Sequence, residues 1–182
     1  MHKILIVLAS FFLSPMAETT PVTIDLTSEV NNQTAASIKT ALDSTTGPVI
    51  IRITSPGGSL FSAIAIEHMI QDHGNVTCIC RSFCASAAVS ILESCQFRLA
   101  TDDAIVMMHQ VAFNNGEGAT RETDADNSRK ALKALDYALC TQLTRRAKIT
   151  GVQLCKSISG NHEIWLTAPE ALKLGFIDQI VP

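Results

Sequence analysis

Short apolar strands alternate with amphipathic helices along this chain, and this alternation is the feature that most limits its fold. Residues 22–27 alternate in polarity and are rich in β-branched side chains, which predicts a strand. Residues 31–44 carry apolar side chains at helical spacing, which predicts a helix. A continuous apolar run with one arginine predicts a buried strand of a parallel sheet at 49–53. Further strands are predicted at 76–80, ending near Met108 and at 176–181, and further helices at 59–73, 85–95, 124–148 and in two short segments before the last strand. Repeated strand–helix–strand units predict a single α/β domain.

Composition excludes two broad classes of protein. Of 182 residues, 47% are hydrophobic and 17% are charged, which is the reverse of a disordered chain. The formal net charge is -3, so the chain lacks the basic excess of a typical nucleic-acid-binding domain. The sequence also has no nucleotide-binding loop. We therefore expect neither a nucleic acid nor a nucleotide as partner.

The first residues indicate export. A basic Lys3 precedes an apolar stretch at 4–13, and small residues follow up to Ala17, as in a secretory signal peptide. The stretch is too short to span a bilayer, which takes about 20 apolar residues. We expect residues 1–17 to be removed and residues 18–182 to form an exported domain, periplasmic or secreted, with no membrane association after cleavage. The alternative is a buried N-terminal strand.

Six cysteines make the redox compartment relevant, because an exported protein can keep disulfides. A helix at 85–95 would return antiparallel to the strand at 76–80, which favours a Cys78–Cys95 pair. Cys140 and Cys155 flank a predicted helix–turn–helix and could form a second pair. The alternative is six buried free thiols. No pair of cysteines with matching histidines has zinc-ligand spacing, so we expect no metal.

Three local patterns could carry chemistry. Gly57 and Gly58 follow a strand and precede a helix, so backbone N–H groups there could stabilise an oxyanion. Ser86 lies among small residues at a strand-to-helix turn, where the helix dipole favours negative charge. His109 follows an apolar strand and could act as a general base. Each pattern alone also fits an ordinary role: a tight turn, a helix N-cap or a structurally bonded histidine.

Taken together and in order, these segments resemble the Clp protease proteolytic subunit family of serine peptidases. The resemblance covers residues 23–181, and the segments that carry it are 24–30, 53–58, 84–87, 107–110 and 166–178. It implies the repeated superhelical α/β fold that this family shares with crotonases, as a single domain. It also implies stacked rings, in which the helix at 124–148 is a protruding handle between one ring and the next, with the 111–122 segment beside it.

The resemblance assigns roles by position. Ser86 matches the nucleophile and His109 the general base, while the backbone N–H groups of Gly58 and Ala87 match the oxyanion hole.

The third member of the triad departs from the family pattern. The family has an aspartate three residues before the leucine that corresponds to Leu166, and this chain has Glu163 there. Glutamate and aspartate both occur in such triads. Asp178 is the alternative acid.

The resemblance implies an endopeptidase that cleaves peptides or unfolded polypeptide segments through an acyl-enzyme intermediate, without a cofactor, as a homo-oligomeric ring. Because an exported protein meets no ATP, we expect an ATP-independent enzyme without an ATPase partner. An apolar row on the 124–148 helix could serve assembly or a monomer core: Leu132, Leu135, Leu139 and Leu143. Two other functions stay open, a catalytically inactive scaffold or binding protein and, less favoured, a crotonase-type acyl-CoA enzyme.

Overall fold

The computed structural model describes residues 20–112 and 122–182. The predicted signal peptide at 1–17 and most of the predicted 111–122 segment lie outside this part of the chain. The elements in chain order are β1 (Val22–Leu26), α1 (Asn32–Asp43), β2 (Val49–Ser55), α2 (Leu60–His73), β3 (Val76–Ala85), α3 (Ala87–Ser94), β4 (Phe97–Thr101), β5 (Ile105–Met108), α4 (Glu122–Leu143), α5 (Gly151–Ile158), β6 (Ile164–Thr167), α6 (Ala168–Leu174) and β7 (Gln179–Val181).

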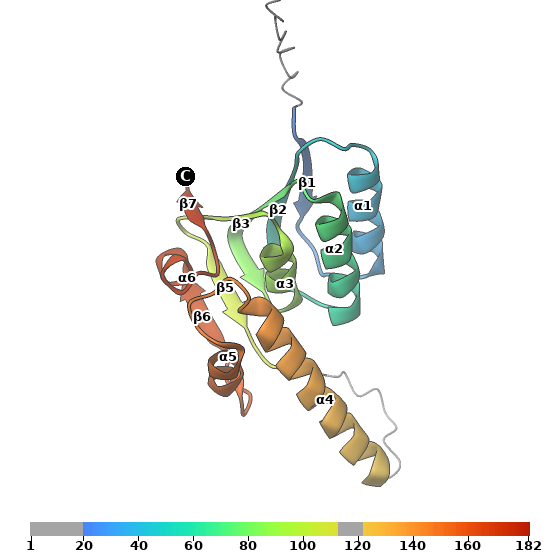
Figure 1. The fold of residues 1–182 in the computed structure, drawn as a ribbon, viewed down its shortest axis with the longest axis vertical. Helices are drawn as coiled ribbons and strands as arrows, with labels where there is room; N and C mark the ends of the chain where they lie inside the picture. Colours follow the sequence, from blue (N-terminus) through green and yellow to red (C-terminus); the bar gives the residue numbers. More distant parts are fainter. Residues whose placement is uncertain (1–19, 113–121) are drawn as a thin grey trace, which may run out of the picture.

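The strands form a mainly parallel sheet in the order β1-β2-β3-β4-β7 (Figure 1). Strand β3 has two partners on the same side, because its first half pairs with β4 and its last residues pair with β5. An irregularity in β3 after Cys80, where Ser82 has a φ of 65°, separates the two halves. Strand β6 then pairs antiparallel with β5. This branching brings the end of β3 next to β5 and β6, where the candidate site lies.

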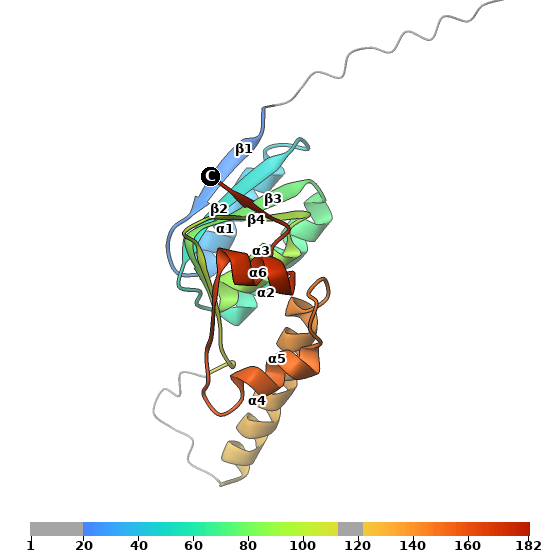
Figure 2. The same ribbon diagram turned by 90° about the vertical axis from the view of Figure 1, so that its left-hand side faces the viewer.

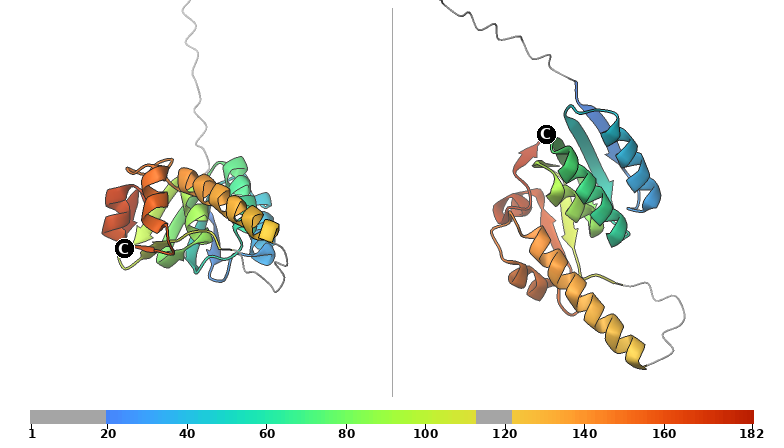
Figure 3. Two further views of the ribbon diagram at one scale, coloured as in Figure 1. Left: turned by 90° about the horizontal axis from the view of Figure 1, so that it is seen from below. Right: turned by 45° about the vertical axis from the view of Figure 1, so that its right-hand side comes forward.

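The core lies between the sheet and helices α1, α2 and α3, which run side by side over one face (Figure 3). In β2, alternate side chains from Val49 to Ser55 are buried on this face, as the two-residue period of a strand requires. Asn31 caps α1 through a capping box, and Gly74 ends α2 in a left-handed conformation. Local sequence signals therefore place the helices that cover the sheet.

Most predicted elements are confirmed, and the differences concern their number and length. The segment expected as one strand ending near Met108 is two strands, β4 and β5, because a turn interrupts it at residues 102–104. Strand β6 was not predicted, since four residues give little periodicity. Strand β3 continues to Ala85 through its irregularity. Helix α4 ends at Leu143 rather than at 148.

Both expected disulfides are present. Cys78 of β3 bonds to Cys95 beyond the end of α3, and Cys140 of α4 bonds to Cys155 of α5. The other two cysteines, Cys80 and Cys84, are free and buried.

Helix α4 projects well beyond the sheet and the three covering helices (Figures 1 and 2). Its leucine row divides into two parts. Leu143 is buried in the core and Leu139 packs against it, while within the described part of the chain Leu132 and Leu135 are half-buried and do not belong to the core. No helix among the described residues is long and apolar enough to cross a membrane.

Candidate active site

Ser86 occupies a sharp turn between β3 and α3. Its backbone has φ 55° and ψ -126°, a conformation that a residue with a Cβ adopts only at an energetic cost. The Ser86 N–H donates to the carbonyl oxygen of Met107 in β5 at 2.8 Å, which ties the turn to the neighbouring strand. The Ser86 hydroxyl makes no capping hydrogen bond to α3. Without that hydrogen bond, Ser86 does not act as an ordinary N-cap, and its side chain is half-buried.

Gly57 packs directly against this turn, and Gly58 packs against the backbone of Val30, which follows β1. A Cβ built on Gly57 would lie 2.7 Å from the Cβ of Ser86 and 2.8 Å from the amide nitrogen of Ala87. The carbonyl oxygen of Gly57 accepts from the N–H of Val30, so the loop is fixed at 2.7 Å to the chain following β1. Only residues without a side chain allow this approach.

Two backbone N–H groups are close to Ser86 along the chain or through one neighbour: Ala87 follows Ser86, and Gly58 follows Gly57, which contacts the Ser86 turn. Within the described residues, no backbone hydrogen bond engages the N–H of Gly58 or of Ala87. The N–H of Ala87 is in the first turn of α3, where helical geometry leaves donors without a partner. Such a pair of donors next to a hydroxyl could stabilise a developing oxyanion.

His109 follows directly after β5. Met107 pairs with Ala85 in the parallel ladder, so the sheet places His109 beside the Ser86 turn. The Nδ1 atom of His109 lies 2.5 Å from the carbonyl oxygen of Gln110. A carbonyl can only accept, so a hydrogen bond here requires the proton on Nδ1, and in that neutral tautomer Nε2 carries the lone pair. Among the described residues no hydrogen bond joins Ser86 Oγ to His109.

Glu163 immediately precedes β6 and reaches the same end of the sheet. The antiparallel ladder ends at the Met108–Ile164 pair, so the next residues along it are His109 and Glu163. The Glu163 carboxylate is exposed, and its Oε2 accepts from the indole Nε1 of Trp165 at 2.9 Å. The structure thus brings the three side chains to one edge without a hydrogen bond between them.

Asp178, the alternative acid, is engaged elsewhere. It accepts from the backbone N–H and the guanidinium of Arg98. Burial acts to raise the pKa of Asp178, but these hydrogen bonds hold it below its ordinary value. Asp178 is therefore the partner of a buried arginine, and its role as the acid of a triad is not supported.

Cys84 lies two residues before Ser86 and is fully buried. Burial raises the pKa of its thiol well above the ordinary value, so the thiol stays protonated. It is an inert core side chain and offers no second nucleophile.

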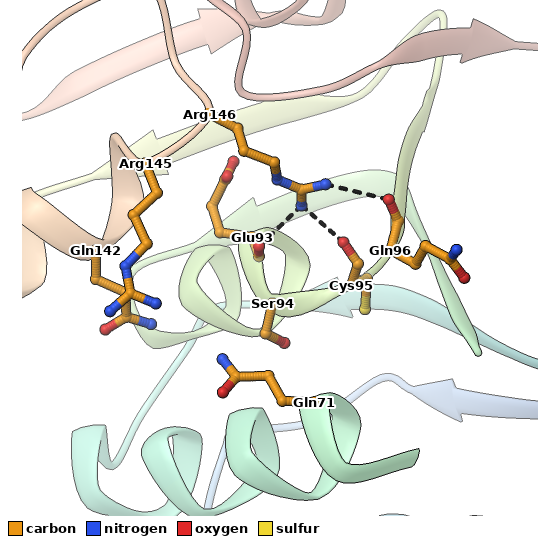
Figure 4. A pocket seen from close by; sticks show the side chains of 8 residues that line it. All are labelled: Gln71, Glu93, Ser94, Cys95, Gln96, Gln142, Arg145 and Arg146. Carbon is orange, nitrogen blue, oxygen red and sulfur yellow. Dashed lines mark hydrogen bonds between the residues drawn. The ribbon is translucent and has the colours of Figure 1, made fainter. Parts of the chain in front are cut away.

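The C-terminal end of α3, opposite to Ser86, borders a cavity of about 310 Å³ (Figure 4). Arg146 spans this cavity and donates to the carbonyl oxygens of Glu93, Cys95 and Gln96. Neither this cavity nor a second one between β1 and α1 is lined by Ser86 or His109. Because the guanidinium of Arg146 already donates to carbonyl oxygens at the end of α3, we assign this cavity a structural role.

Two features of the site were not predicted from the sequence. Trp165 holds the Glu163 carboxylate, and the alternation of a strand at 164–167 would have placed both side chains on one face had that strand been predicted. Asp136 of α4 accepts from the N–H of Val111 and the amide of Gln110, and so fixes the chain after His109. No local pattern distinguishes this aspartate from others on the helix. In the described parts of the chain, no cluster of His, Cys, Asp and Glu side chains could hold a metal ion.

Comparison with known proteins identifies relatives of one kind. A family model described as Clp protease matches residues 16–182. The chain is 33% identical over 139 residues to the ATP-dependent Clp protease proteolytic subunit 3 of Streptomyces coelicolor, a match that covers 73% of this chain and 60% of the relative. It is 29% identical over 136 residues to the ATP-dependent Clp protease proteolytic subunit of Porphyromonas gingivalis, covering 73% of this chain and 59% of the relative.

The fold also matches a solved structure. A mutant of ClpP1 from Listeria monocytogenes superimposes with a TM-score of 0.76 at 20% identity, over 87% of this chain and 90% of that chain. The match supports the same fold. The aligned part of this chain spans about 60% of the length of the curated relatives above.

Proposed function

The chain belongs to the Clp protease family, and from this premise we propose that it is a serine endopeptidase. Its substrates are peptides or unfolded polypeptide segments, and the reaction passes through an acyl-enzyme on Ser86. The conformation of Ser86 carries the proposal, because its positive φ at a strand-to-helix turn presents the hydroxyl at a helix N-terminus. Energetically costly conformations of this kind cluster at functional sites.

His109 is the proposed general base. Its protonated Nδ1 leaves Nε2 free to take the proton from Ser86 Oγ as the oxygen attacks a peptide carbonyl. A rotation of the imidazole that brings Nε2 to Ser86 Oγ would complete the dyad, since catalytic hydrogen bonds often tighten only when substrate is bound. Glu163, next along the β5–β6 ladder, would then accept a hydrogen bond from Nδ1–H and orient the ring.

The N–H groups of Gly58 and Ala87 are the proposed oxyanion hole. Ala87 follows Ser86 and Gly58 follows Gly57, which contacts the Ser86 turn, and neither N–H is engaged in a backbone hydrogen bond within the described residues. Losing one such donor raises the barrier by about 2.7–4 kcal/mol in serine peptidases. Water then hydrolyses the acylated serine, with His109 acting again as base.

We propose an exported, ATP-independent enzyme that assembles into a homo-oligomeric ring. Two disulfides, Cys78–Cys95 and Cys140–Cys155, support an oxidising compartment. The predicted signal segment at 1–17 supports the same location. The curated relatives are named ATP-dependent, so ATP independence is a property proposed for this chain alone. N-terminal sequencing of the mature protein and peptidase assays without ATP test these two proposals.

A fluorophosphonate probe tests the chemistry directly. The wild-type protein should be labelled on Ser86 and should cleave an unfolded protein substrate, while Ser86→Ala should show neither reaction. Ser90→Ala is a suitable control, because Ser90 lies on the same helix with its hydroxyl bound to the carbonyl of Ala87. Equal labelling of wild type and Ser86→Ala contradicts the proposal.

An inactive scaffold or binding protein is the second candidate, and one observation favours it. The imidazole of His109 faces the Gln110 carbonyl and Glu163 faces Trp165, so the three side chains are not joined. An assembled wild-type protein that neither reacts with the probe nor cleaves any unfolded substrate would establish this alternative.

A further inference from the structure

Glu163 poses a problem of orientation if it serves as the acid of the triad. The side chain is exposed, and it has one more rotatable bond than the aspartate it replaces. An exposed glutamate loses considerable rotamer freedom when it is held in one position. A carboxylate that must accept a hydrogen bond from the Nδ1–H of His109 therefore needs a second restraint.

Trp165 supplies such a restraint. Glu163 and Trp165 are two residues apart at the start of β6, so their side chains share one face of the strand. The indole Nε1–H donates to Oε2 of Glu163 at 2.9 Å. No hydrogen bond within the described residues engages Oε1 of Glu163, so that oxygen is free to accept from His109.

The indole is itself fixed to the strand that carries the nucleophile. Its ring stacks on Phe83 with centroids 6.0 Å apart and planes inclined by 20°. Phe83 lies in β3, three residues before Ser86, and the backbone of Trp165 pairs with Met107 of β5. Trp165 therefore links the strands that position Ser86 and His109 to the carboxylate that precedes β6.

Exposure argues against a purely structural role. Trp165 is 54% exposed and Phe83 is half-buried, so the stacked pair contributes little to the core. The exposed indole of Trp165 instead lies next to the proposed catalytic edge.

We propose that Trp165 is a positioning residue that holds one oxygen of the Glu163 carboxylate so that the other oxygen can accept a hydrogen bond from the Nδ1–H of His109. This inference rests on the proposed peptidase function. It assigns to this chain a compensation for the replacement of aspartate by glutamate.

A double-mutant cycle tests the proposal. Trp165→Phe keeps a ring that can stack on Phe83 and removes the donor, so kcat should fall roughly tenfold with KM unchanged. In a Glu163→Ala background the same substitution should cause no further loss of kcat. A rise in KM at unchanged kcat, or equal losses of kcat in both backgrounds, overturns the proposal. Circular dichroism should show that each variant is folded.

Fluorescence gives a test that is independent of catalysis. Trp165 is the single tryptophan of the chain, so tryptophan emission reports on the surroundings of Trp165 alone. Glu163→Ala should change the emission maximum or intensity, including in the Ser86→Ala protein, whereas Asp102→Ala in the exposed turn before β5 should not. Unchanged emission in Glu163→Ala overturns the proposal.

The two tests separate the inference from the proposed function. Active wild-type enzyme with unaltered kcat in Trp165→Phe overturns the role of Trp165 and leaves the peptidase function intact. Wild-type protein that the fluorophosphonate does not label overturns the peptidase function itself, and the positioning role with it.

Discussion

At the scale of single residues, the room around Ser86 is set by glycines rather than by side chains. A Cβ on Gly57 would lie 2.6 Å from the carbonyl oxygen of Ala85, and a Cβ on Gly58 would lie 2.4 Å from that of Val30. Both contacts are with backbone atoms, which cannot move aside without moving their strands. Both glycines also have positive φ, at 90° and 142°. The loop at 57–58 can therefore pack against the Ser86 turn and Val30 only with glycine at both positions.

Gly57→Ala should impair both stability and catalysis. The added methyl group displaces the backbone of the Ser86 turn, and the positive φ adds strain of about 1–3 kcal/mol. Displacing the Ala87 N–H from the oxyanion position should lower kcat by roughly 10²-fold or more. Peptidase assays and chemical denaturation measure the two effects.

Gly74→Ala is the matched control. Gly74 also has positive φ, at 75°, but a Cβ there would meet its nearest atom at 3.9 Å. This variant should lose only about 1 kcal/mol of stability and keep the activity of the wild type. Equal losses of activity in the two variants would show that backbone strain alone, rather than contact with Ser86, limits the site.

The sequence predicts the residue types of the site better than their contacts. Gly57, Gly58 and Ser86 could be singled out because each follows a strand and precedes a helix. The contacts of Glu163 and His109 could not be predicted, since both depend on side-chain rotamers and on the pairing of β5 with β6. Local sequence does not encode such long-range pairing.

At the scale of elements, α3 is held at both ends. Its N-terminus follows the Ser86 turn, and Arg146 donates to the carbonyls at its C-terminal end. Beneath that end, the buried guanidinium of Arg98 bonds to Glu93 of α3 and to Asp178 before β7. The positive charge of Arg98 is thus paired with two carboxylates, and within the described residues Oε1 of Glu93 has no hydrogen-bond partner. This cluster fixes the helix whose first turn provides a proposed oxyanion donor.

Glu93 should make stability depend on pH. Burial raises its pKa from 4.5 to about 7, although Arg98 acts in the opposite direction. Because the folded state then binds more protons than the unfolded state, the free energy of unfolding should fall as pH rises through this window, by up to about 3 kcal/mol. Glu93→Gln should remove most of this slope in denaturation curves measured between pH 4.5 and 7.

Asp178 should affect the pH dependence of the free energy of unfolding in the opposite direction to Glu93. The pKa of Asp178 is lowered, so its contribution is present at neutral pH and is lost as the solution becomes strongly acidic. The Asp178→Asn variant should be less stable than wild type at pH 7 and approach wild type at low pH. If the free energy of unfolding of the wild type does not change between pH 4.5 and 7, the raised pKa of Glu93 is contradicted.

The Cys140–Cys155 disulfide should stabilise the pairing of α4 with α5. The bond closes a loop with a sequence separation of 15 residues, which corresponds to about 3 kcal/mol in the chain-entropy model. The Cys140→Ser/Cys155→Ser variant should therefore melt about 10 °C below wild type. Dithiothreitol should have a smaller effect on this variant than on wild type. Non-reducing peptide maps that show other pairings would contradict the assignment.

Elements with clear periodicity were predictable, and elements defined by partners were not. The leucines of α4 and the continuous apolar run that begins β2 identify these two elements from the sequence alone. The four residues of β6 become a strand because they pair with β5. Strand β3 continues beyond Cys80 because Phe83 and Cys84 pair with β5 and Cys84 also pairs with Ser55 of β2. Tertiary hydrogen bonds decide both cases.

At the scale of the whole molecule, one helix extends beyond the rest. Helix α4 has 22 residues and a length of about 33 Å, and the figures show it reaching past the domain (Figure 3). Its C-terminal part joins the core through Cys140 and Leu143. Its outer part carries Leu132 and Leu135, which lie outside the core among the described residues, and Tyr137 is 63% exposed. Apolar side chains on a projecting helix favour contact with a second copy of the chain.

The Leu132→Glu/Leu135→Glu variant should reduce the size of the assembly without unfolding the domain. The chain mass is 19.6 kDa, so light scattering should give a multiple of this value for wild type. If α4 joins two rings, as the family resemblance implies, the charged variant should have roughly half the wild-type mass. Because neither leucine belongs to the core, its circular dichroism and melting temperature should stay close to those of wild type.

Lys133→Glu, an exposed charge reversal on the same helix, is the control and should keep the full mass. Equal masses for the double-leucine variant and wild type would place the contacts between copies away from the outer part of α4. A wild-type mass equal to that of the single chain would contradict ring assembly altogether, and the peptidase would then act as a monomer with its catalytic edge open to solvent.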